Sequence, residues 1–189
     1  MEANAQAAYY ESQGMVGLQG LSLLLRGLTG LAGRKTVVLL SGGLIAGDRA
    51  GSRPDLGGSM MSVGAEAGAA DTSMYVLHMD NSFSEPFSSA APIVRDPSDR
   101  MRTASRDEYL LGTGLDRLAG AAGGALLRVQ AGTGGIAFAR ILRESAAYYL
   151  LGVQPAAEDR DGALHFLRVK VNKRGVTVRT RTHVVIPKR

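Results

Sequence analysis

Three short runs of apolar residues constrain the fold of this chain more than any other feature. They cover residues 36–40 (TVVLL), 73–79 (SMYVLHM) and 125–129 (ALLRV). Uninterrupted β-branched and aliphatic runs of this length are typical of strands that are covered on both faces, as in parallel sheets. Segments with helical spacing of apolar residues separate the runs. This alternation predicts an α/β protein whose parallel strands are joined by right-handed crossovers.

Four segments carry the helical pattern, at residues 15–31, 60–70, 105–122 and 133–145. In the first, leucines recur at intervals of three and four residues, which is typical of an amphipathic helix. In the third, Ser105 and Glu108 have the spacing of a capping box, which predicts a helix start at Ser105. The Gly-rich residues 46–59 and the Pro-containing residues after Asp80 are expected to be loops.

The pattern changes after residue 145. Residues 146–153 (AAYYLLGV) read as a strand, and residues 165–171 alternate apolar and polar side chains at a period of two. Residues 172–175 (NKRG) then predict a turn, and residues 176–185 are expected to form the second, antiparallel strand of a hairpin. The chain therefore divides into an α/β part at residues 1–145 and an antiparallel β module at residues 146–189.

The charge of the chain is concentrated at its end. Residues 160–189 hold nine Lys or Arg and one acidic residue, whereas residues 1–159 hold 13 basic and 16 acidic residues. Four cations of the predicted hairpin fall on one face: Arg168, Lys170, Arg179 and Arg181. Such a surface would attract a polyanion. The favoured interpretation is a solvated face whose charges also discourage edge pairing, because no aromatic residues lie between the cations.

Few residues in this sequence are suited to catalysis or metal binding. The chain has no Cys and three scattered His, so thiolate chemistry and Cys-based metal sites are excluded. His78 and Asp80 share a face at a strand end, but two ligands do not make a metal site. No apolar run approaches the roughly 18 residues of a membrane span, and the N-terminus does not resemble a signal peptide. We expect no enzyme activity and no cofactor.

One glycine-rich pattern resembles a nucleotide-binding turn. Residues 132–137 (GTGGIA) follow a predicted strand and open a helix, with the G-x-G-x-x-A spacing that can hold a pyrophosphate. No acidic residue stands at the end of the next predicted strand, where a ribose contact would be expected. A plain strand-to-helix turn is therefore favoured, and a nucleotide enzyme is kept as a weaker alternative.

Several of these segments together resemble a known family. They are residues 28–43 (LTGLAGRKTVVLLSGG), 74–78 (MYVLH), 115–119 (LDRLA), 146–155 (AAYYLLGVQP) and 162–171 (GALHFLRVKV). Over residues 15–182 the chain is similar to the VWFA-related acidobacterial family of von Willebrand factor type A-like proteins. The resemblance implies a partial doubly wound sheet that lacks the first strands of a type A domain, and a periplasmic, cell-envelope or secreted location.

The resemblance also indicates what happens to the metal site of type A domains. Their Asp-x-Ser-x-Ser motif has no counterpart here, and their Thr-Asp-Gly turn corresponds to Ser41, Gly42 and Gly43, with Gly42 in place of the Asp. An oxygen-ligand Mg²⁺ site would lack its carboxylates, so no metal is expected. The turn at Ser41 to Gly43 stays a candidate binding position.

These observations favour a non-enzymatic protein-interaction or structural module with an unidentified protein partner. The alternative is a polyanion-binding protein that uses the basic hairpin. In the type A arrangement the strand at residues 36–40 would pair with a strand that this sequence does not encode. Self-association through the Thr36 to Leu40 edge is therefore expected.

Overall fold

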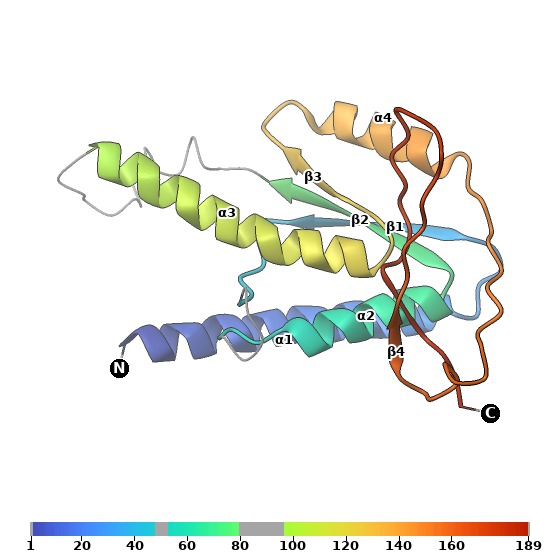
Figure 1. The fold of residues 1–189 in the computed structure, drawn as a ribbon. Coiled ribbons are helices and arrows are strands. Elements are labelled where there is room, and N and C mark those ends of the chain that lie inside the picture. Colours follow the sequence, from blue (N-terminus) through green and yellow to red (C-terminus); the bar gives the residue numbers. More distant parts are fainter. Residues whose placement is uncertain (1, 48–52, 80–96, 189) are drawn as a thin grey trace.

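The computed structural model describes residues 2–47, 53–79 and 97–188, in which four helices alternate with a parallel sheet (Figure 1). The sheet has the order β1-β2-β3, and a second sheet pairs β4 with β5 in antiparallel fashion. This confirms the predicted α/β class with a C-terminal antiparallel module. The elements are α1 (Glu2–Leu28), β1 (Lys35–Ser41), α2 (Gly57–Ala69), β2 (Thr72–Met79), α3 (Pro97–Ala121), β3 (Leu126–Val129), α4 (Gly134–Ser145), β4 (Leu164–Phe166) and β5 (His183–Val185).

Strand β2 is the centre of the parallel sheet. Every residue of β2 except Met79 is buried, which explains its unbroken apolar run. In the register, Val38 of β1 is opposite Tyr75, and His78 is opposite both Ser41 and Arg128. Strand β1 pairs only with β2 among the described residues, so it is an edge strand rather than an interior one.

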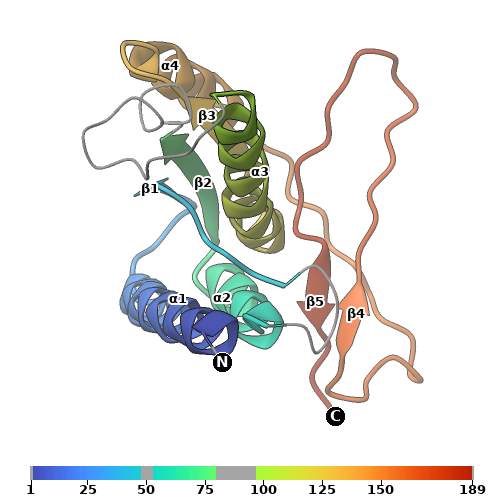
Figure 2. The ribbon, with the colours of Figure 1, turned by 90° about the vertical axis from the view of Figure 1, so that its left-hand side faces the viewer.

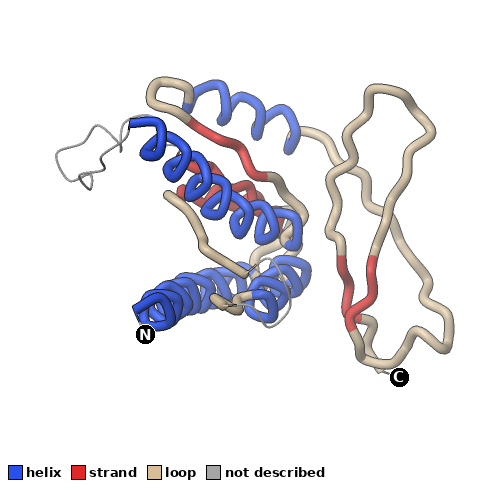
Figure 3. Tube along the Cα trace, turned by 60° about the vertical axis from the view of Figure 1, so that its left-hand side comes forward, coloured by secondary structure: helices blue, strands red, loops and turns tan. Residues whose placement is uncertain are grey.

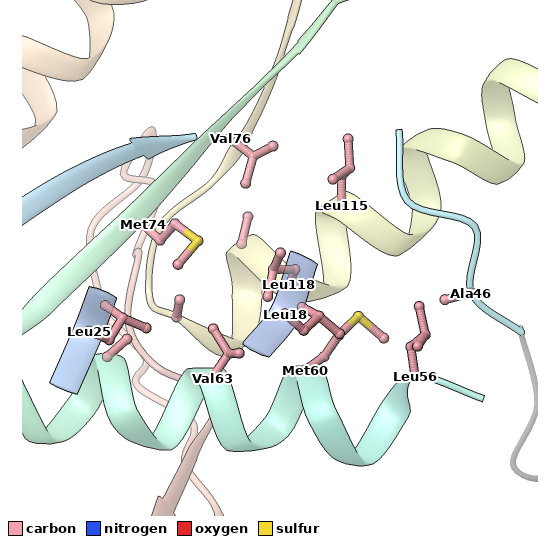
Figure 4. Packing of buried hydrophobic residues seen from close by; sticks show 13 residues of the cluster. Leu18, Leu25, Ala46, Leu56, Met60, Val63, Met74, Val76, Leu115 and Leu118 are labelled. Atoms are coloured by element: carbon pink, nitrogen blue, oxygen red, sulfur yellow. The ribbon is translucent and has the colours of Figure 1, made fainter. Parts of the chain in front are cut away.

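Three helices cover one face of the sheet (Figure 2). Leu18 and Leu25 of α1 pack with residues of α2 and α3 against Met74 and Val76 of β2 (Figure 4). The other face is covered by α4, where Ile141 packs with Tyr75 and Leu77. Because alternate residues of β2 point to opposite faces, one strand contributes to both clusters, as a doubly wound arrangement requires.

Three helices begin earlier than the sequence predicts: α2 begins at Gly57, inside the predicted loop at residues 46–59, and α1 and α3 begin earlier by larger margins. Helix α1 extends back to Glu2, through residues whose side chains are mostly exposed and which therefore show no apolar periodicity. The Ala, Gln and Glu residues of this stretch favour a helix by propensity alone. Helix α3 begins at Pro97, a residue type that fits the first turn of a helix. Ser105 lies inside α3, so the predicted capping box at Ser105 and Glu108 is wrong.

The C-terminal module is less regular than predicted (Figure 3). Residues 146–153 form no strand, which contradicts the sequence prediction. Residues 164–185, here called the C-terminal hairpin, turn at residues 174–175 as expected, but only its base is paired. Leu164 is opposite Val185, Phe166 is opposite His183, and the Leu167 amide donates to the Thr182 carbonyl at 2.8 Å. Beyond this point no further backbone pairs join the two arms among the described residues, so the strand propensity of the arms does not by itself extend the ladder.

The predicted loop that follows Asp80 lies outside the described residues up to residue 96. No helix in the described part of the chain is long and apolar enough to cross a membrane.

Candidate interaction site

The predicted binding turn lies at the carboxyl end of the sheet. Ser41 Oγ is 3.2 Å from both the amide nitrogen and the carbonyl oxygen of Gly43. The next residue, Leu44, donates its amide to the Leu111 carbonyl of α3 at 3.1 Å. Gly43 has a φ of 149°, and a Cβ there would overlap the Leu111 side chain. The turn is therefore packed against α3, and glycine is required at Gly43 for both conformation and space.

A buried histidine lies at this end of the sheet, between the turn after β1 and α3. The His78 Nε2 atom is 3.3 Å from the Gly42 carbonyl oxygen, and its Nδ1 atom is 3.3 Å from Glu108 Oε1. His78 is completely buried, and its ring lies between the turn after β1 and Glu108 of α3, although its Nδ1 atom makes no hydrogen bond within the described part of the chain. No group of three or more potential metal-ligating side chains occurs among the described residues, and Asp80 lies outside them. This geometry gives His78 a structural role, and the absence of metal binding stays a prediction.

The Gly-rich residues 132–137 form a strand-to-helix turn, as predicted. Gly132 has a φ of 84° and lies between β3 and α4. The Thr133 hydroxyl donates to the Gln130 carbonyl at 2.9 Å, and its oxygen lies 3.0 Å from the Gln130 amide. These contacts stabilise the turn from within, and the positive φ of Gly132 gives this glycine a conformational role whether or not a ligand binds.

The four predicted hairpin cations do not lie together as one free surface. Arg179 turns toward α4, where its Nε and Nη2 atoms donate to Glu144 at 2.5 and 3.3 Å. Arg181 lies over Gly123, and its Nη2 atom is 3.9 Å from Asp71 Oδ1. Arg168 and Lys170 are exposed and make no ion pair within the described chain. Two of the four cations thus attach the hairpin to the α/β part.

The carboxylate of Glu144 is the centre of this attachment. Arg140, one turn earlier on α4, donates to it at 2.8 Å. Burial alone would raise the pKa of Glu144, but the hydrogen bonds from Arg140 and Arg179 outweigh it and hold the pKa below its ordinary value of 4.5. Burial and the Glu144 carboxylate together raise the pKa of the Tyr75 hydroxyl. Glu144 is therefore ionised and fully engaged at neutral pH.

A groove of about 770 Å³ separates the C-terminal hairpin from the α/β part. One wall is formed by hairpin residues, among them Val169, Val171, Val176 and Val178. The other wall comes from β2, the end of α4 and the segment that follows α4, including Tyr75, Glu144 and Tyr148. At its rim the Arg34 guanidinium lies 4.7 Å from the centre of the Tyr148 ring, a cation–π contact. The groove is thus lined mainly by apolar side chains, together with the charged side chains of Arg34, Glu144, Lys173 and Arg179.

The segment at residues 148–153, here called the apolar segment, runs along this groove and is unusually exposed. Tyr149 is 93% and Leu150 87% exposed, and Tyr148, Leu151 and Val153 are also more than half exposed. Monomeric proteins rarely leave a contiguous apolar surface of this kind uncovered unless it has a function. The apolar segment and the groove beside it are therefore the best candidate for a functional site.

Sequence reasoning singled out only part of this site. It selected Arg179, but it passed over Glu144, Tyr75 and Arg34. The i,i+4 spacing of Arg140 and Glu144 was the one local signal that could have drawn attention to the carboxylate. The turn at Ser41 to Gly43 lies at the carboxyl ends of the strands, whereas the hairpin lies at their amino ends (Figure 1). The two predicted sets of site residues are therefore not brought together.

Comparison with known proteins does not assign this site. No protein-family model, curated protein or solved structure matches the chain. Any function for the groove must therefore be argued from its own residues.

Proposed function

We propose that this chain is a non-enzymatic protein-interaction module that binds its partner through the apolar segment and the adjoining groove. The observation that carries the proposal is the exposure of five large apolar side chains in six residues, with Tyr149 and Leu150 almost entirely in solvent. Burying an exposed Leu or Val side chain contributes about 1.5 to 3 kcal/mol, so a partner that covered this segment would gain much of its affinity there.

The type A resemblance is compatible with this proposal. The α/β architecture is the one that the resemblance implies, and the turn at Ser41 to Gly43 offers a carbonyl and a hydroxyl but no carboxylate. On this basis we propose a type A-like module that binds protein without the metal-dependent mechanism of type A domains. A periplasmic, cell-envelope or secreted location belongs to the same proposal.

Panning of a displayed random peptide library against the immobilised chain tests the interaction function. The counter-selection uses a double variant, Leu150→Ser with Leu151→Ser, and the matched control uses Leu23→Ser on the exposed face of α1. We expect enriched peptides that bind the wild type and the α1 variant equally and lose about tenfold or more in affinity for the double variant. Failure to enrich any peptide that distinguishes the double variant would overturn the proposal.

A polyanion-binding function is the second candidate. It is supported by the exposure of Arg168, Lys170, Lys173 and Arg174 on the hairpin, and it is weakened by the engagement of Arg179 and Arg181 with carboxylates. Retention on a heparin column that falls steeply with salt, and that is lost on replacing Arg168 and Lys170 with Ser, would favour this candidate. Retention that is unaffected by those substitutions would exclude the hairpin as its site.

A further inference from the structure

The arms of the C-terminal hairpin carry backbone groups that have no partner. Between residues 168 and 180 of the described chain, apart from the turn at residues 174–175, no backbone hydrogen bond joins one arm to the other or to another element. The arms are nevertheless extended on either side of the turn and rich in Val, a residue that favours strands. Arms of this kind can accept an additional strand, in which main-chain hydrogen bonds supply affinity and alternate side chains fill pockets.

The groove next to these arms has apolar side chains on both walls. Val169, Val171, Val176 and Val178 lie on the hairpin side, and Tyr148 and Leu151 lie on the opposite side. A bound strand would therefore meet apolar contacts through the side chains of every second residue. Val171, Val176 and Val178, which are 50%, 47% and 38% exposed, would become buried.

The charges at the groove are not balanced. Glu144 is already shared by Arg140 and Arg179. Arg34 donates to the Ser73 hydroxyl at 2.8 Å and contacts the Tyr148 ring, but it has no carboxylate partner, and Lys173 also makes no ion pair among the described residues. The rim thus presents two cations whose charge nothing in the described structure neutralises, which favours an anionic ligand.

From the unpaired arms, the apolar walls and the cationic rim together, we infer that the groove binds an extended peptide that alternates apolar and acidic residues, by strand addition to the hairpin. This inference rests on the proposed function, since it names the partner chemistry of the same site. Apolar side chains of the peptide face the valine wall, and its carboxylates lie beside Arg34 and Lys173. An extended acidic segment of a partner protein is the occupant that satisfies all three features.

The test measures binding of an acetylated, amidated eight-residue peptide in which valine alternates with glutamate, by fluorescence anisotropy with the whole chain. Two control peptides are a version with lysine in place of glutamate and a version with every peptide bond N-methylated, which has no peptide N–H group to donate to the arms. Two matched protein variants are Lys173→Glu, at the groove, and Lys170→Glu, an exposed cation of the same arm that does not line the groove.

We expect the glutamate peptide to bind, both control peptides to bind at least about tenfold more weakly, and Lys173→Glu alone to weaken binding by about tenfold. Equal weakening by Lys170→Glu and Lys173→Glu, with displacement by heparin, would overturn the inference in favour of diffuse polyanion attraction. Equal affinity for the N-methylated peptide would overturn strand addition. If library-selected peptides bind the apolar segment but the glutamate peptide does not, the inference fails while the proposed function stands.

Discussion

Arg179 of the C-terminal hairpin donates hydrogen bonds to both carboxylate oxygens of Glu144 on α4. Its Nε atom is 2.5 Å from Oε2, and its Nη2 atom is 3.3 Å from Oε1. Both side chains are about one quarter exposed. This two-point contact is a direct link between the module and the α/β part, and two-point arginine–carboxylate pairs fix geometry as well as adding energy. The Glu144 carboxylate is therefore one of the contacts that set the orientation of the groove walls, together with the approach of Arg181 to Asp71.

The stability of this link should depend on pH. The pKa of Glu144 is below 4.5 in the folded protein, so the contribution of the pair is fully present above about pH 4.5 and is lost as the pH falls through the folded value. Glu144→Gln should lower the free energy of unfolding by about 1 kcal/mol at pH 7 and by less in acid.

Urea melts at pH 7 and at pH 3 measure the effect on stability. The matched control is Glu158→Gln, at an exposed position without an ion pair among the described residues, which should change little at either pH. Equal losses for the two variants, or a loss for Glu144→Gln that is the same at both pH values, would contradict the assignment.

Two glycines of α3 should respond in opposite ways to alanine. A Cβ at Gly114 would overlap the carbonyl oxygen of Leu44, whereas a Cβ at Gly120 meets nothing within 4 Å. Gly114→Ala should destabilise the protein by about 1 to 3 kcal/mol through strain, and Gly120→Ala should stabilise it by about 0.5 to 1 kcal/mol through helix propensity. Thermal denaturation of the two variants measures these changes in stability. A Gly114→Ala variant as stable as the wild type would show that the turn after β1 does not pack on α3.

Neighbouring leucines of α1 should differ sharply in their effect on stability. Leu25 is completely buried against α2 and the sheet, whereas Leu23 is 69% exposed. Leu25→Ala should cost about 2 to 5 kcal/mol, and Leu23→Ala about 0.5 kcal/mol or less. Denaturant titration measures the stability of both variants. Equal losses of stability at the two positions would mean that α1 does not pack on the sheet through the face that carries Leu25.

The edge of β1 should mediate self-association. Within the described residues its outer side has no strand partner, and Leu40 on it is 60% exposed. A charged side chain on an edge strand discourages edge-to-edge pairing. Leu40→Lys should therefore reduce the apparent mass in sedimentation experiments, whereas Leu142→Lys, at an equally exposed position of α4, should not. A wild type that stays monomeric at high concentration would refute the prediction.

The parallel α/β core could be predicted from local patterns in the sequence. Buried strands such as β2 leave an unbroken apolar run, and buried helix faces such as that of α4 leave a helical period, because burial on a regular element repeats with the geometry of that element. The turn of the C-terminal hairpin was also specified locally, by a short polar segment with Gly175 at a φ of 75°.

The end of the hairpin ladder and the pairing of distant charges depend on tertiary contacts, so local patterns did not predict them. Residues 146–153 have strand propensity but find no partner strand, and the hairpin ladder ends near Leu167 and Thr182, because strand formation depends on contacts that lie outside the segment itself. The Arg179–Glu144 pair joins residues 35 positions apart. No local pattern encodes such a contact, since it exists only after α4 and the hairpin have been placed side by side.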